Sequence, residues 1–163
     1  KKKKNYWSRG FWTENKKTNY YKMKKILIIN SNYYKEISYH LVLNAKKTLV
    51  NTNFKLSILE VPGAYEIPIA IKRNIKKFDA FIALGCVIKG QTPHFDLICN
   101  SIFSSILNLS VDYNKPIGNG IITALNLKQA KQRSKNTNRK KPNKGSEAAK
   151  ALLSILKNGP KKI

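Results

Sequence analysis

The sequence has few cysteines and few histidines. Its two cysteines, Cys86 and Cys99, fall in a strand-like apolar run and in a helix-like run. They form no metal-ligand or redox spacing, and the chain has only two histidines, which argues against a metal centre. We therefore expect both cysteines to be reduced residues of the core.

Long apolar runs are also missing. No run approaches the roughly 20 residues that cross a bilayer, and residues 1–25 lack the continuous apolar centre of a signal peptide. These absences argue against a membrane-spanning helix and predict a cytoplasmic protein.

Acidic residues are scarce: 8 Asp and Glu face 32 Lys and Arg, for a formal net charge of +24. Such an excess is typical of proteins that neutralise nucleic-acid phosphates. The two densest tracts, residues 1–22 and 131–144, do not space aromatic residues as a stacking platform for bases, although aromatic residues do occur in the first tract. We interpret the charge mainly as solvated surface. A basic nucleic-acid-binding module stays as the alternative.

The length of 163 residues suits one domain. Residues 1–22 show no sustained hydrophobic period, and the only methionine, Met23, directly precedes an apolar run. We therefore predict a basic extension over 1–22 and a folded domain over 23–163. The extension is either an organelle-targeting remnant or mistranslated upstream sequence. Mass spectrometry of the native N-terminus separates the two.

From Ile26 onward, short apolar runs alternate with segments of helical spacing. This order predicts a single α/β domain, in which a four-stranded parallel sheet carries helices on both faces. The expected strands are 26–29, 54–61, 80–87 and 117–125. The expected helices are one with Ile37, Leu41, Ala45 and Leu49 on its buried face, one with Pro68 in its first turn, and the segments 95–109, 127–134 and 146–156.

Ligands of parallel sheets bind beyond the carboxyl ends of the strands. In this sequence three loops rich in Gly, Pro and polar residues, 30–33, 61–66 and 89–94, follow the first three strands. We expect these loops to converge on one edge of the sheet and to form the site.

His94 is the residue of these loops best suited to moving protons. It stands at the start of a helix, where free amides and the helix dipole attract anions and disfavour imidazolium. A neutral imidazole can accept a proton near pH 7, although an ordinary capping role is equally open. The preceding Gly90, Gln91 and Thr92 form a plausible phosphate cradle without the spacing of a P-loop. His40, inside a helix, is interpreted as a surface or boundary residue.

Other polar residues have two interpretations each. Glu66 is either a stabilising carboxylate at a helix start or an acceptor for a polyol or an amine. Tyr33 either stacks on a flat heterocycle or covers the sheet edge. For Arg133 and Lys144, the residues alone indicate only solvated charge.

Four segments, VPGAYEIP (61–68), LGCVIKGQTPHFD (84–96), PIGNGIIT (116–123) and NKGSEAA (143–149), resemble the marker segments of lumazine synthases, in the same order. The resemblance runs from Met23 to Leu156, and its first two segments together are highly specific. It implies a flavodoxin-like three-layer sandwich that needs no cofactor and no metal. It also implies that 5-amino-6-ribitylamino-uracil condenses with 3,4-dihydroxy-2-butanone 4-phosphate to give 6,7-dimethyl-8-ribityllumazine and phosphate.

The resemblance also assigns roles. A pyrimidine would stack on Tyr33, meet backbone groups around Val87 and Ile88, and lie near Lys144, while His94 transfers protons. The remaining residues would hold the ribityl chain (Ala64, Tyr65 and Glu66) and the phosphate (Gln91, Thr92 and Arg133).

The sequence departs from the family pattern in three places. Asn119 stands where relatives often place a phenylalanine that covers the ring from a neighbouring subunit, and Lys89 replaces a frequent arginine. The stretch between Arg133 and Lys144 is a few residues longer than usual. The family's sites lie between subunits, so a monomer should be inactive, and the longer stretch favours isolated pentamers over a sixty-subunit shell. A flavodoxin-like or degenerate homologue that binds a flavin or nucleotide without catalysis is the second alternative.

Overall fold

The computed structural model describes residues 23–135 and 142–157. The predicted extension over 1–22 lies outside these residues, and the domain boundary at Met23 stays a prediction. Four parallel strands form one sheet in the order β2-β1-β3-β4. The strands are β1 (Lys24–Ser31), β2 (Phe54–Val61), β3 (Ala80–Ile88) and β4 (Ile117–Ala124). The helices are α1 (Lys35–Leu49), the 3-10 helix η1 (Ala64–Glu66), α2 (Ile67–Asn74), α3 (His94–Asp112), α4 (Leu127–Ser134) and α5 (Lys144–Lys157).

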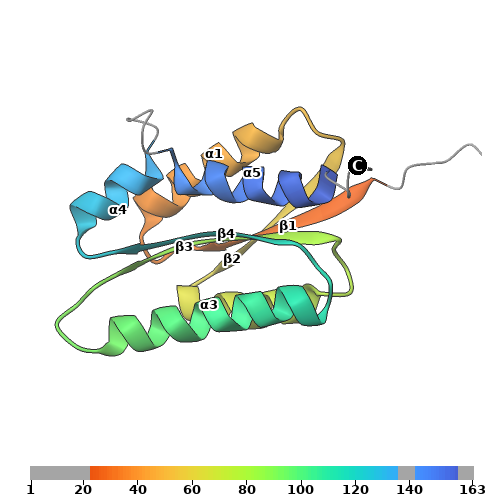
Figure 1. Cartoon of the computed structure of the whole chain (residues 1–163). Coiled ribbons are helices and arrows are strands. Elements are labelled where there is room, and N and C mark those ends of the chain that lie inside the picture. The colour runs from red at the N-terminus through yellow and green to blue at the C-terminus, as the bar shows by residue number, and fades with distance from the viewer. Residues whose placement is uncertain (1–22, 136–141, 158–163) are drawn as a thin grey trace, which may run out of the picture.

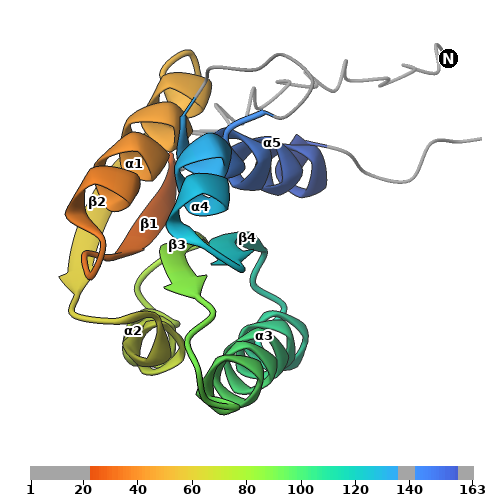
Figure 2. The same ribbon diagram turned by 90° about the vertical axis from the view of Figure 1, so that its left-hand side faces the viewer.

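Helices cover both faces of the sheet and make three layers, which confirms the predicted fold (Figures 1 and 2). Helices α1, α4 and α5 lie on one face, and α2 and α3 lie on the other. Each face has its own apolar cluster, because alternate residues of a strand point to opposite faces. Ile26 and Ile28 belong to the α1 side, whereas Leu27 and Ile29 belong to the α2 side.

Strand β3 is the buried centre of the sheet. Residues 80–86 are all buried, as predicted for a parallel strand covered on both faces. Gly85 allows its close packing, since a Cβ there would lie 3.1 Å from the Cβ of Ser31 and 3.4 Å from the Cδ1 of Ile67.

Both cysteines are buried and neither is in a disulfide, as predicted. Burial raises the pKa of Cys86 to about 12, and the nearby Cys99 adds to this rise. Burial also raises the pKa of Cys99. Both thiols therefore stay protonated at neutral pH.

The parallel register brings the carboxyl ends of the strands together. Ser31 is paired with Val61, and Ile88 with Ala124. Beyond the first pair, the Asn32 amide donates to the Val61 carbonyl at 3.0 Å, which ties the first two loops to each other. No helix in the described ranges is both long and apolar enough to span a bilayer.

Candidate active site

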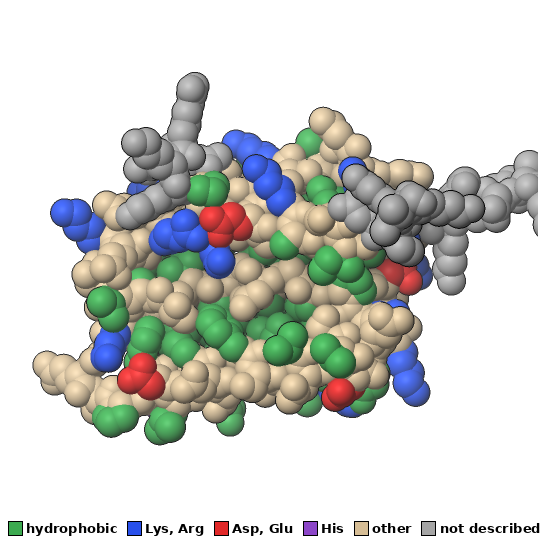
Figure 3. All heavy atoms as spheres, in the orientation of Figure 1, with side chains coloured by type: hydrophobic (Ala, Val, Ile, Leu, Met, Phe, Trp, Pro, Cys, Tyr) green, Lys and Arg blue, Asp and Glu red, His purple; other side chains and the backbone are tan. Residues whose placement is uncertain are grey.

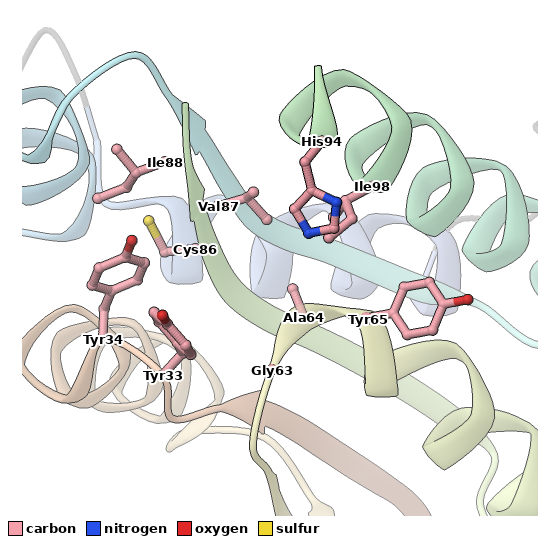
Figure 4. Close-up of a pocket in the computed structure, with 10 residues that line it drawn as sticks. All are labelled: Tyr33, Tyr34, Gly63, Ala64, Tyr65, Cys86, Val87, Ile88, His94 and Ile98. Carbon is pink, nitrogen blue, oxygen red and sulfur yellow. The ribbon is translucent and has the colours of Figure 1, made fainter. Parts of the chain in front are cut away.

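A pocket of about 270 Å³ lies at the carboxyl ends of β1 and β3 (Figure 4). It collects residues from all three predicted loops and from the end of β3. Its lining residues are Tyr33, Tyr34, Gly63, Ala64, Tyr65, Cys86, Val87, Ile88, His94 and Ile98.

His94 is the first residue of α3, and its side chain lies on one side of the pocket. The N-cap of this helix is Pro93, whose carbonyl accepts hydrogen bonds from the amides of Asp96 and Leu97. No side chain caps the helix start. The capping role that the sequence left open for His94 is therefore not realised, and its imidazole faces the pocket.

Tyr33 lies across the pocket from His94 (Figure 4). The residue is 72% exposed, so it does not serve as core packing. The neighbouring Tyr34 meets it edge-on, with ring centroids 5.0 Å apart and planes at 69°. An exposed ring braced on one edge leaves a face free for a flat ligand.

The second loop forms η1 and borders the pocket at Gly63 and Ala64. A Cβ on Gly63 would lie 2.8 Å from Oε2 of Glu66, so the absent side chain lets this carboxylate approach the loop. Tyr65 lines both this pocket and a neighbouring hollow of about 370 Å³ between α2 and α3, which Glu66 also lines. Glu66 is thus beside the pocket rather than within it.

Gln91 and Thr92 are exposed in the turn that leads from β3 to α3. The turn precedes the first amides of a 19-residue helix, which lack partners within the helix and favour anions. Lys89 Nζ lies 3.8 Å from the Asp96 carboxylate in the first turn of α3. This contact offsets part of the negative charge that would oppose an anion there.

A separate hollow of about 210 Å³, called the second hollow below, contains Asn119, Arg133 and Lys144. Strand β4, α4 and the start of α5 supply them. Asn119 is exposed, and its Oδ1 accepts a hydrogen bond from the Ile121 amide at 3.0 Å. The rest of the lining is Phe103, Ile121, Ile122 and Thr123.

Arg133 and Lys144 are not merely solvated charges. Arg133 Nη2 donates to Glu147 Oε2 at 2.9 Å, and Arg133 Nη1 donates to the Pro142 carbonyl at 3.3 Å. Lys144 Nζ lies 3.2 Å from the same Glu147 oxygen. The two cations, which belong to α4 and α5, are thereby held together in half-buried positions.

Two sets of the predicted residues thus lie in separate hollows. The first pocket holds the ring-stacking and proton-transfer candidates, and the second hollow holds the cations. The face that carries the edge of β4 shows hydrophobic side chains along a hollowed band between the two helix layers (Figure 3).

The sequence did not point to some of the residues that line these hollows or contact their side chains. The only sequence signal for Tyr34 is its place beside Tyr33. The positions of Phe103 and Glu147 depend on tertiary packing, that is, on how α3 and α5 meet β4 and α4. Within the described ranges, no group of three His, Cys, Asp or Glu residues is placed to hold a metal.

Comparison with known proteins gives one consistent family. The family model described as 6,7-dimethyl-8-ribityllumazine synthase matches residues 23–158. A protein of that name from Bartonella bacilliformis is 37% identical over 136 residues, which cover 81% of this chain and 90% of the relative. Another, from Buchnera aphidicola subsp. Baizongia pistaciae, is 44% identical over 139 residues, covering 82% and 86%. These matches favour the enzyme over the nucleic-acid-binding alternative.

Proposed function

The chain belongs to the 6,7-dimethyl-8-ribityllumazine synthase family, and we propose that it catalyses the condensation that the family name describes. Its substrates are 5-amino-6-ribitylamino-uracil and 3,4-dihydroxy-2-butanone 4-phosphate, and it releases phosphate and water. The observation that carries the proposal is the pocket in which His94 lies across from the exposed ring of Tyr33.

The pyrimidine lies on Tyr33 and turns its polar edge to the backbone at Val87 and Ile88, which line the same pocket. The ribityl chain then extends past Ala64 and Tyr65 toward Glu66. Tyr65 supports this path because it lines both the pocket and the hollow that contains Glu66. A half-buried carboxylate that accepts hydroxyl hydrogen bonds discriminates strongly against ligands that lack those hydroxyls.

His94 acts as general acid and base. The amine attacks the ketone and loses water to form an imine, phosphate is eliminated, and the ring closes with loss of a second water, so every stage moves protons. Holding the two substrates together supplies much of the rate. Proton transfer by His94 adds about 10² to 10⁴. The phosphate lies at Gln91 and Thr92, before the amides of α3, where an anion is stabilised.

The second hollow completes the site of an adjacent subunit. Arg133 then reaches the phosphate, while Lys144 and Asn119 reach the pyrimidine. This arrangement follows from a head-to-tail contact, in which one surface of a subunit meets a different surface of the next. The apolar band in Figure 3 and the exposed Leu97, Leu107 and Val111 on α3 support such an association. A pentamer is the assembly that we propose, in preference to a sixty-subunit shell, and the cytoplasmic location stays a prediction.

The test is direct. The purified protein is incubated with both substrates while the fluorescence of the lumazine product and the released phosphate are followed. Stoichiometric formation of both products supports the proposal. An intact oligomer that binds the product but forms none would identify a degenerate homologue, and tight flavin binding without condensation would favour the nucleotide-binding alternative.

A further inference from the structure

Tyr34 is a pocket residue that none of the roles above includes. It stands directly before α1 and lines the pocket together with Tyr33, which it meets edge-on at 5.0 Å. This edge-to-face geometry is favourable for aromatic pairs. Since Tyr33 is 72% exposed, the contact with Tyr34 limits where the stacking ring can lie.

The place of Tyr34 is costly for the helix. It is the N-cap of α1, a position that favours Ser, Thr, Asp or Asn, and no side chain caps this helix start. Departures from a local rule of this kind are expected mainly at functional sites.

The surroundings hold Tyr34 in one place. Its ring is half-buried and packs against the apolar cluster on the α1 side of the sheet. Figure 4 shows it beside Cys86 and Ile88, at the end of the pocket away from His94. The distance from His94 argues against a part in proton transfer.

The Tyr34 hydroxyl is a neutral polar group among apolar neighbours. Burial raises the pKa of Tyr34, and the nearby Cys86 and Tyr33 add to this rise. The phenol therefore keeps its proton near pH 7 and can both donate and accept a hydrogen bond. Its neighbours at this end, Cys86, Val87 and Ile88, present weakly polar or apolar side chains.

We propose that Tyr34 is a positioning and specificity residue for the heterocycle. Its ring braces Tyr33, and its hydroxyl hydrogen-bonds the polar edge of the flat ring that lies on Tyr33. The inference rests on the proposed function, because it takes that ring to be the pyrimidine of the substrate. It adds a recognition contact that is separate from the chemistry at His94.

The experiment compares Tyr34→Phe with Tyr39→Phe. Tyr39 is a matched control: it lies in the second turn of α1, close to Tyr34 in the sequence, is 64% exposed, and makes a similar edge-on contact, with His40 at 5.4 Å and 70°. The affinity for 6,7-dimethyl-8-ribityllumazine is measured by fluorescence titration, alongside kcat and both KM values. Tyr34→Phe keeps the ring and loses the hydroxyl, whereas Tyr34→Leu loses both.

We expect Tyr34→Phe to weaken lumazine binding about tenfold, as loss of a hydrogen bond does. Tyr34→Phe should raise the KM of the pyrimidine substrate by a similar factor. It should leave kcat and the KM of the phosphorylated substrate within about twofold of wild type. Tyr34→Leu should weaken binding further, and Tyr39→Phe should leave it unchanged. If wild type binds the lumazine and Tyr34→Phe binds it equally well, the Tyr34 proposal fails alone. If wild type neither binds nor turns over, the proposed function fails with it.

Discussion

Arg133 and Lys144 share one carboxylate oxygen: Oε2 of Glu147 lies 2.9 Å from Arg133 Nη2 and 3.2 Å from Lys144 Nζ. The side chains of Arg133 and Glu147 are each 31% exposed, so solvent screens the pair only in part. One negative charge facing two positive ones leaves the cluster net positive. Such a cluster both orients the guanidinium and keeps its attraction for a phosphate.

Arg133→Ala should therefore raise the KM of the phosphorylated substrate about ten- to hundredfold, the loss expected for a hydrogen bond to a charged group. The KM of the pyrimidine substrate should change little. Steady-state kinetics with each substrate varied in turn measures both values. Arg73→Ala, on the exposed part of α2, is the control. An equal rise in both KM values would contradict the phosphate role.

His94→Ala should lower kcat by about 10² to 10⁴, because it removes the general acid and base but no large binding surface. The affinity for the lumazine product should change much less. His40→Ala is the control, because His40 is half-buried on α1 and lies against Tyr39. Single-turnover measurements isolate the chemical steps. If kcat survives the loss of His94, another group moves the protons.

Glu36 links the stability of the protein to pH. Hydrogen bonds from Lys135 and Lys131 lower the pKa of Glu36 from its ordinary value of 4.5 to about 2. A lowered pKa in the folded state stabilises the fold above the ordinary value, and the gain disappears as pH falls from 4.5 toward 2. Glu36→Gln should thus unfold at lower urea than wild type at pH 7, and the difference should vanish near pH 2. The difference in stability between wild type and Glu36→Gln should also shrink in salt, because solvent reaches the side chains of Glu36, Lys131 and Lys135. A stability difference that stays constant with pH would contradict the role of the lowered Glu36 pKa.

Gly145 sets how closely α5 approaches α1. A Cβ at this position would collide with the backbone carbonyl of Leu41, and backbone cannot rotate away as a flexible side chain can. Gly145→Ala should therefore lower the free energy of unfolding by about 1–3 kcal/mol. Gly90→Ala is the matched control, since a Cβ at Gly90 would meet nothing within 4 Å. Urea denaturation of both variants makes the comparison, and equal stabilities would show that the contact relaxes freely.

Sequence periodicity was enough to predict the sheet and its helices, because apolar runs and four-residue spacing reflect burial directly. The ends of the strands and helices were predicted less accurately. Strand β1 begins at Lys24, before the apolar run, because register with β2 pairs Lys24 and Lys25 with Phe54 and Lys55. The helix expected from residue 95 begins at His94.

The site was harder to predict than the fold. The loops at the strand ends could be placed on one edge from topology alone, and His94 lies there. The contact between Arg133 and Glu147 joins residues 14 apart on different helices, and no local pattern signals it. The role of Tyr34 depends on the packing of its ring, which composition does not specify.

His94 lies in the pocket and Arg133 lies in the second hollow, and this separation leads to one further prediction. If adjacent subunits build each site, His94 comes from one subunit and Arg133 from the next. His94→Ala and Arg133→Ala variants, each impaired alone, should then regain activity when unfolded together and reassembled. A hybrid contains some interfaces at which the intact His94 of one subunit faces the intact Arg133 of its neighbour.

The size of the recovery distinguishes the arrangements. In a head-to-tail ring of randomly mixed subunits, about a quarter of the interfaces carry both intact residues. Measured at a concentration of the phosphorylated substrate far below the raised KM of Arg133→Ala, the mixture should therefore approach a quarter of wild-type activity, with wild-type KM values at the restored sites. Mixing without unfolding is the control, because subunits that do not exchange form no new interfaces. If each subunit held a complete site, no pairing would restore both residues, and the mixture would show only the average of the two impaired enzymes.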